Sequence, residues 1–186
     1  MLNTPFSPWP SFTQEEADAV SNVLLSNKVN YWTGNECREF EKEFATWAGC
    51  EYAIALGNGT LALDLALKAL GVGEGDEVIT TPRTFLASAS SIVTAGAAPV
   101  FADVDLNSQA ITAESIQAVL TEKTKAVIVV HLAGMPAEMD AIMALCDARG
   151  IPVLEDAAHS LGTLWDGRNI GTLGKIGCFS FQSYKM

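Results

Sequence analysis

The sequence has no long apolar run and few basic residues, and each shortage excludes a class of protein. The longest apolar runs, such as KAVIVVHLAG at 125–134, are far shorter than the ~18 to 20 residues that a helix needs to span a bilayer. Only 11 lysines and arginines oppose 22 aspartates and glutamates, and the resulting charge of -11 repels phosphate backbones and anionic headgroups. We therefore expect no nucleic acid and no membrane as a partner.

Paired cysteines, clustered histidines and a leader are also missing. The four cysteines show no CxxC spacing, which argues against a zinc knuckle or a redox pair. No ligand spacing connects the two histidines, His131 and His159, so no metal is expected. The opening MLNTPFSPWP has no basic region followed by an apolar stretch, so the expected location is the cytoplasm.

The residues that are present predict a folded α/β protein. From residue 52 onward, short apolar runs alternate with helical segments near 60–71, 84–96, 112–121 and 136–149. The runs are YAIAL, EVITT, PVFADV, AVIVVH and IPVLED. Because they are continuously apolar, the sheet should be covered on both faces, which favours mostly parallel strands flanked by helices.

The first fifty residues predict two further helices. Thr13 is a plausible N-cap with Glu16 three residues later, and a second helix carries Phe40, Phe44 and Trp47 on one face, most simply as core packing. We expect an N-terminal helix and irregular segment over 1–35 and a large domain over 36–186.

Ligands of parallel sheets bind beyond the carboxyl ends of the strands, so the residues there are candidates for a site. Gly57-Asn58-Gly59-Thr60 precedes a helix and offers backbone N–H groups to an anion such as a phosphate; the alternative is an ordinary glycine turn with Thr60 as N-cap. The string matches neither GxGxxG nor GxxxxGK[ST], so a nucleotide-binding domain gains no support.

Three more side chains follow the later strands. Phe85 offers a ring that could stack on a flat ligand, although core burial is the alternative. Asp156 ends an apolar strand, where a carboxylate is costly unless it meets a cation. His159 lies three residues beyond it and is either part of the site or a structural histidine.

Lys185 follows the apolar stretch CFSF and is either a desolvated, nucleophilic amine or a solvated lysine. A short-chain reductase would need Tyr-x-x-x-Lys, whereas Tyr184 and Lys185 are adjacent. An anion cradle, a stacking ring, a buried acid and a lysine together are what pyridoxal 5'-phosphate (PLP) requires.

The sequence closely resembles the DegT/DnrJ/EryC1/StrS aminotransferase family over essentially its whole length. The segments that carry the resemblance are TGNECREFEKEFATWAG, ALGNGTLALDLALKALGVGEGDEVITTPRTFLASASSI, GAAPVFADVD, VVHLAGMPAEMDAI, VLEDAAHSLGT and GCFSFQSYK. The resemblance implies the large domain of a fold-type I PLP enzyme.

The resemblance also implies roles for individual residues. Gly59, Thr60 and Ser180 would contact the cofactor phosphate, Phe85 would stack on its ring, and Asp156 would pair with the ring nitrogen.

Two further roles follow from the same resemblance. His159 would approach the phenolic oxygen of the ring, and Lys185 would bind the cofactor aldehyde and then act as the base and acid of the proton shift. Glu155 is expected to be structural. Relatives that dehydrate sugars carry histidine in place of the lysine, so Lys185 favours transamination.

The implied activity is transfer of an amino group from glutamate or glutamine to a nucleotide-linked keto-sugar or a related keto-cyclitol, by a homodimer. Family members are about twice as long, so we expect a fragment that lacks the small C-terminal domain and is inactive alone. The alternative is a non-catalytic PLP-fold protein with a regulatory or assembly role. The sequence does not identify the keto-sugar, the position aminated, the donor or the pathway.

Overall fold

The computed structural model describes residues 10–185, which divide into two compact units, one ending at Ala55 and the other beginning at Leu56. Residues 1–9 of the predicted N-terminal segment lie outside the described residues. The predicted division at residues 35 and 36 stays a prediction.

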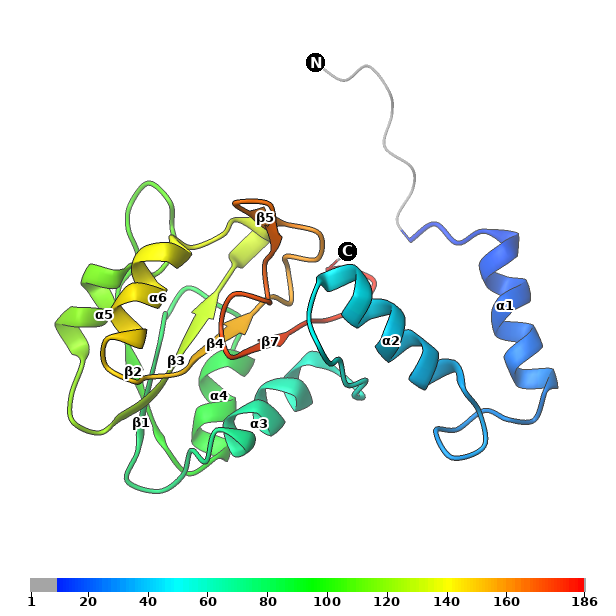
Figure 1. Cartoon of the computed structure of the whole chain (residues 1–186), viewed down its shortest axis with the longest axis horizontal. Helices are drawn as coiled ribbons and strands as arrows, with labels where there is room; N and C mark the ends of the chain where they lie inside the picture. The colour runs from blue at the N-terminus through cyan, green and yellow to red at the C-terminus, as the bar shows by residue number, and fades with distance from the viewer. Residues whose placement is uncertain (1–9, 186) are drawn as a thin grey trace, which may run out of the picture. The chain divides into compact units, whose positions relative to one another are not determined.

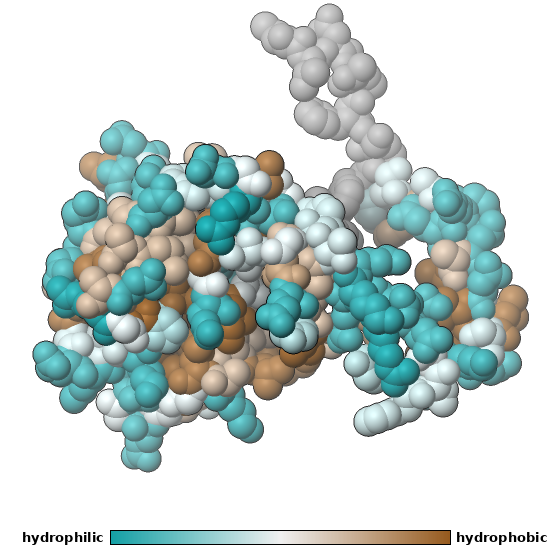
Figure 2. All heavy atoms as spheres, viewed as in Figure 1, coloured by the Kyte–Doolittle hydropathy of each residue, from teal (hydrophilic) through white to brown (hydrophobic). Residues whose placement is uncertain are grey.

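Residues 10–55 of the N-terminal unit contain two helices, α1 (Gln14–Leu25) and α2 (Glu36–Ala48) (Figure 1). The predicted cap of α1 is confirmed: Glu16 N–H donates to the Thr13 hydroxyl at 3.2 Å, and Thr13 N–H donates to the Glu16 carboxylate at 2.6 Å. Figure 2 shows hydrophobic residues on the surface of this unit near α1, where Val20 and Leu24 are both more than half exposed.

The aromatic stripe of α2 differs from the prediction. The rings of Phe40 and Phe44 lie 5.8 Å apart and those of Phe44 and Trp47 lie 5.3 Å apart, so the stripe packs along its own helix. Phe40 is 38% exposed and Trp47 is 47% exposed, so the prediction that both are core residues is wrong. Helical spacing places side chains on one face but does not fix how deeply each of them is buried.

The second unit is built on a five-stranded, fully parallel sheet in the order β2-β1-β3-β4-β7. Its strands are β1 (Glu77–Thr80), β2 (Ala98–Phe101), β3 (Thr124–Val130), β4 (Val153–Asp156) and β7 (Ile176–Cys178). A short antiparallel pair lies outside this sheet, namely β5 (Leu164–Trp165) and β6 (Arg168–Asn169).

Helices cover both faces of this sheet, which confirms the predicted fold class (Figure 1). On β3, Ile128 faces a core that includes residues of α3 and α4, and Val129 faces a core that includes residues of α5 and α6. The helices of this unit are α3 (Gly59–Ala69), α4 (Ala87–Thr94), α5 (Ala113–Val119), the 3-10 turn η1 (Leu132–Gly134) and α6 (Met139–Asp147). Alternate residues of one strand are therefore buried in different layers, which explains why the strand sequences are continuously apolar.

Four of the five predicted strands are present, but the run YAIAL at 52–56 forms none. Tyr52 is 76% exposed and Ile54 is 72% exposed. An apolar run becomes a strand only where another strand offers it backbone hydrogen bonds, and no strand among residues 10–185 pairs with it. Within the same residues, no helix combines the length and apolar composition needed to cross a bilayer.

The connections of the sheet create a crevice at its carboxyl edge. The chain runs from β1 outward to β2 and then crosses back over β1 to β3, after which β4 and β7 follow on the far side. The carboxyl ends of β1 and β3 therefore lie at a topological switch point, the place where open parallel sheets bind ligands.

Candidate active site

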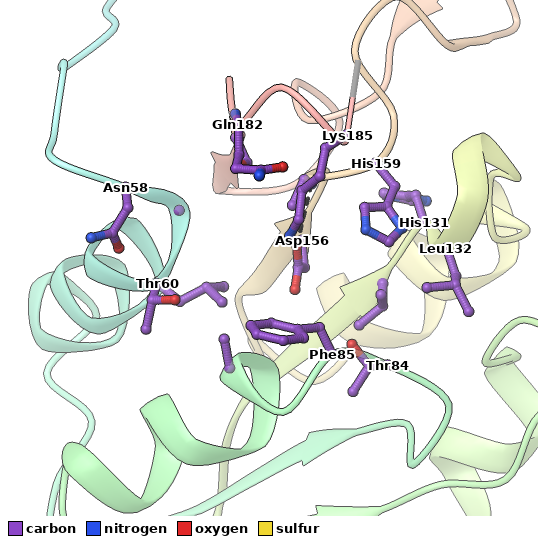
Figure 3. Close-up of a pocket in the computed structure, with 16 residues that line it drawn as sticks. Asn58, Thr60, Thr84, Phe85, His131, Leu132, Asp156, His159, Gln182 and Lys185 are labelled. Atoms are coloured by element: carbon purple, nitrogen blue, oxygen red, sulfur yellow. Dashed lines mark hydrogen bonds between the residues drawn. The ribbon is translucent and has the colours of Figure 1, made fainter. Parts of the chain in front are cut away.

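A pocket of about 370 Å³ lies at this carboxyl edge, between the ends of four strands and the beginning of α3 (Figure 3). All the site residues predicted from the sequence line it. The lining residues are Asn58, Gly59, Thr60, Leu63, Thr84, Phe85, Ala87, Val130, His131, Leu132, Asp156, Ala158, His159, Ser180, Gln182 and Lys185.

The beginning of α3 forms one wall of the pocket. The N-cap is Asn58, whose side chain accepts a 3.0 Å hydrogen bond from Leu61 N–H, so the alternative of Thr60 as N-cap is wrong. A Cβ atom on Gly59 would lie 3.1 Å from the Phe179 carbonyl oxygen, so glycine lets the helix approach the segment after β7. The first N–H groups of the helix and its dipole make this wall suitable for an anion.

Phe85 and Lys185 meet across the pocket. Phe85 follows β1 and is 60% exposed, so the alternative of core burial is wrong for this residue. Lys185 is partly buried, and its Nζ lies 5.0 Å from the centroid of the Phe85 ring. The amine therefore stands over the aromatic face, and it is the one lysine among the described residues that line the pocket.

Asp156 ends β4, an inner strand of the sheet, and lies between Val130 of β3 and Cys178 of β7. Asp156 is 7% exposed, and its carboxylate accepts hydrogen bonds from the Ser88 hydroxyl at 2.6 Å and from Ala158 N–H at 3.2 Å. No lysine, arginine or histidine within residues 10–185 forms an ion pair with it. Two hydrogen bonds leave lone pairs on this buried carboxylate for a cationic group of a ligand.

His159 faces the same cavity, held by the turn that follows β3. Its Nδ1 accepts a 3.3 Å hydrogen bond from Ala133 N–H, where Ala133 adopts a left-handed conformation with φ 55°. In the neutral ring, the proton then lies on Nε2. His159 can therefore donate a hydrogen bond from Nε2 to an oxygen atom in the pocket.

Behind the pocket, Glu155 and His131 form a fully buried pair with a Nε2–Oε2 distance of 3.1 Å. Glu155 also accepts from the backbone N–H groups of Gly171, Leu173 and Gly174 at 2.6 to 2.8 Å. Burial alone would raise the pKa of Glu155, but the hydrogen bonds from His131 and from Gly174 and Gly171 outweigh it and hold this pKa below its usual value. These bonds tie the loop before β7 to β4, in agreement with the structural role expected of Glu155.

Sequence reasoning missed several residues of the site, namely Asn58, Thr84, Ser88, His131 and Gln182. Asn58 was detectable, because asparagine before a helix is a strong N-cap signal. Ser88 gives no comparable signal, since one serine among several in LASASSI cannot be assigned to an acid sixty-eight residues away. Cys178 lies beside Asp156, yet burial and the Asp156 charge raise the pKa of its thiol to about 12, so it is not a nucleophile at neutral pH.

These groups fit pyridoxal phosphate by their chemistry. The helix beginning suits a phosphate, the exposed face of Phe85 suits a flat ring, and Asp156 suits a protonated ring nitrogen. Lys185 supplies the amine with which the aldehyde of the cofactor can form a covalent bond. The absence of an ion-pair partner for Asp156 among the described residues is the observation that selects a cationic heterocycle over a neutral one.

The fold and this pocket match the large domain of PLP-dependent aminotransferases. Residues 10–186 match the sequence profile of the DegT/DnrJ/EryC1/StrS aminotransferase family, and the chain belongs to this family. The resemblance inferred from the sequence is thereby confirmed.

Individual relatives agree with this assignment. The chain is 44% identical over 176 residues to the spore coat polysaccharide biosynthesis protein SpsC of Bacillus subtilis (strain 168), a match that covers 95% of this chain and 45% of SpsC. The crystal structure of an aminotransferase from Psychrobacter cryohalolentis is 64% identical with a TM-score of 0.95, and the match covers 97% of this chain and 46% of that one.

A third relative bears on the cofactor. The PLP form of the putative sugar aminotransferase Spr1654 from Streptococcus pneumoniae is 31% identical with a TM-score of 0.88, covering 98% of this chain and 50% of that chain. The same protein is also known in a pyridoxamine phosphate (PMP) form. The family uses pyridoxal phosphate, which confirms the predicted cofactor. This chain spans about half the length of the relatives that it matches.

Proposed function

We propose that this chain provides the cofactor site of a PLP-dependent aminotransferase that moves an amino group from glutamate or glutamine to a nucleotide-linked keto-sugar or a related keto-cyclitol. The observation that carries the proposal is the pairing, in one pocket, of a buried carboxylate without a cation and a lysine amine over an exposed aromatic ring. We place the protein in the cytoplasm, as its composition suggests, and we propose a homodimer, as the family resemblance implies. Sedimentation of the purified protein tests the dimer.

The chain's own residues would hold the cofactor from three sides. Gly59 and Thr60 would bind its phosphate with Ser180, which lies next to Gly59 across the pocket wall. Phe85 would hold the ring from one face, and the Asp156 carboxylate would keep the ring nitrogen protonated. When bound, the cofactor supplies an aldehyde that accepts an amino group and a protonated ring that withdraws electrons from the reacting carbon.

Lys185 and His159 would act on protons in this pocket. The Lys185 amine would hold the aldehyde until an amino donor arrives, and the freed Nζ would then take a proton from one carbon and return it to another. The Nε2–H of His159 would donate to the phenolic oxygen of the ring, since Ala133 N–H occupies Nδ1.

The sugar substrate is supported by what the relatives are. SpsC is a spore coat polysaccharide biosynthesis protein, and Spr1654 is a putative sugar aminotransferase. A role in amino-sugar or polysaccharide biosynthesis is the function that these relatives favour for the protein that contains this chain.

Exchanging Asp156 for asparagine tests the proposed function most directly. We expect the wild-type protein that contains this chain, once loaded with PLP, to form PMP with glutamate or glutamine, and the change in absorbance measures this reaction. Asp156→Asn should still bind the cofactor but react more than about 100-fold more slowly, because a neutral amide no longer stabilises the ring cation.

Two outcomes would count against this proposal. An unchanged rate in Asp156→Asn would remove the role of the carboxylate. If the wild-type protein that contains this chain binds the cofactor but reacts with neither donor, the non-catalytic alternative is favoured.

Exchanging Gly59 for alanine tests the phosphate wall. The added methyl group would press on the Phe179 carbonyl and displace the beginning of α3, so we expect PLP affinity to fall roughly tenfold, the loss typical of one hydrogen bond to a charged group. Gly57→Ala is the matched control, since its Cβ would meet Leu61 Cδ1 at an ordinary 3.5 Å. Titration of both variants with PLP measures the difference, and equal affinities would rule out this placement of the phosphate.

A further inference from the structure

A chain of three side-chain oxygens runs behind the pocket and ends on Asp156. The Thr84 and Ser88 hydroxyl oxygens lie 2.7 Å apart, and the Ser88 hydroxyl lies 2.6 Å from Asp156 Oδ2. Thr84 and Asp156 line the pocket, whereas Ser88 is 0% exposed and lies in the first turn of α4. The chain thus joins the loop after β1 to the end of β4.

The direction of these hydrogen bonds follows from the chemistry of their ends. An ionised carboxylate has no proton, so Ser88 must donate to Asp156. The Ser88 oxygen is then the acceptor for Thr84, whose hydroxyl donates to it. The Ser88–Asp156 distance of 2.6 Å lies in the range of charge-assisted O–H···O⁻ bonds, and successive hydroxyl groups polarise one another.

The two donors to Asp156 hold its carboxylate at both oxygens. Ser88 donates to Oδ2 and Ala158 N–H donates to Oδ1, so rotation of the carboxylate would break both bonds. Thr84 precedes Phe85 in the sequence, so the ring-stacking residue is next to the first member of this series of hydrogen bonds.

We propose that Ser88 is a positioning residue that fixes the orientation and the negative charge of Asp156 toward the ring nitrogen of the cofactor, and that Thr84 acts through Ser88. This inference rests on the proposed function, because it assigns to Asp156 the ring nitrogen as partner. The loop that carries Phe85, the ring-stacking residue, is then joined by hydrogen bonds to Asp156, the partner of the ring nitrogen.

Removing the Ser88 hydroxyl group tests the proposal. In Ser88→Ala, Asp156 Oδ2 loses its donor, so we expect PLP affinity and the rate of reaction with the amino donor to fall by roughly 10- to 100-fold. The absorption band of bound PLP should also change, because it reports the protonation of the ring. Ser88→Thr keeps a hydroxyl group and should restore affinity and spectrum to within about threefold of wild type.

The matched control is Ser91→Ala, the same exchange one turn later in α4. Ser91 is 1% exposed, and its hydroxyl donates to the Ser88 carbonyl oxygen at 3.4 Å instead of to Asp156. PLP titration, the spectrum of the loaded protein and the thermal midpoint of the cofactor-free protein are measured for each variant. Equal PLP affinities and spectra for Ser88→Ala and Ser91→Ala would overturn the inference, whereas a wild-type protein that binds no PLP would overturn the proposed function itself.

A double-mutant cycle with Thr84→Val tests whether Thr84 acts through Ser88. We expect Thr84→Val to weaken PLP binding by roughly threefold to tenfold in the wild-type background and to cost nothing more once Ser88 is alanine. Additive losses would show that Thr84 contacts the cofactor independently and would overturn that part of the proposal. If the Ser88→Ala protein does not fold, the PLP affinity of Thr84→Val alone tests the proposal. A PLP affinity of Thr84→Val within twofold of wild type would contradict the series of hydrogen bonds through which Thr84 and Ser88 support Asp156.

Discussion

In the protein that contains this chain, Lys185→Ala is expected to lose the visible absorption band of bound PLP and to lower turnover by roughly 10³-fold or more. No other lysine of the described residues lines the pocket, and the Lys185 Nζ stands 5.0 Å from the centre of the Phe85 ring. Without this amine, nothing in the described pocket binds the cofactor aldehyde covalently. Borohydride reduction followed by peptide mass analysis measures the covalent link, which should map to Lys185 in the wild-type protein.

Lys175→Ala is the matched control for this exchange. Lys175 is exposed, lies before β7 and does not line the pocket, so its removal should leave both the absorption band and the borohydride product in place. A Lys185→Ala protein that still incorporates the cofactor on reduction would disprove the assignment of this lysine.

Glu155→Gln is expected to destabilise the protein by about 3 to 5 kcal/mol, the cost typical of breaking a buried pair. Glu155 is 0% exposed and accepts four hydrogen bonds, three of them from the backbone of the loop before β7. A glutamine has one acceptor oxygen, and its amide NH₂ group would face N–H donors. Urea unfolding measures the loss, and the exposed Glu122→Gln is the control that should stay within about 0.5 kcal/mol of wild type.

The pH dependence of unfolding provides a second test of Glu155. Because the folded pKa of Glu155 is below its unfolded value of 4.5, this group stabilises the fold fully above about pH 4.5. That contribution is lost as the pH falls through the folded pKa. Glu155→Gln should therefore reduce the difference in stability between neutral and acidic pH, and an unchanged acid dependence would show that the carboxylate is not held by these bonds.

The fold could be predicted from the sequence wherever a local pattern also satisfied the tertiary structure. The runs EVITT and AVIVVH became strands because each has a parallel neighbour and a helical layer on both faces. The run YAIAL is also short and apolar, but it has no paired strand among residues 10–185 and forms no strand. A short apolar run therefore predicts that a segment can form a strand. It does not predict whether a neighbouring strand is present to pair with it.

Most members of the site could be predicted because three short segments, after β1, at the end of β4 and after β7, place functional side chains at strand ends. In a parallel sheet these positions all reach the same edge, so Phe85, Asp156 and Lys185 converge in one pocket. Gly59 and Thr60 lie instead at the beginning of α3. The connections between them could not be predicted, since hydrogen bonds such as that from Ser88 to Asp156 join residues far apart in the sequence.

The sequence by itself determined the class of fold, the family and the chemical groups available for the cofactor, because these depend on residue types and their order. Only the tertiary structure decided that Asn58 and not Thr60 caps α3, that the aromatic stripe of α2 remains partly exposed, and that Ser88 supports Asp156. The physical reason is that a hydrogen bond or a buried contact depends on distances of a few ångströms between elements, which packing of the α/β layers sets and residue order does not.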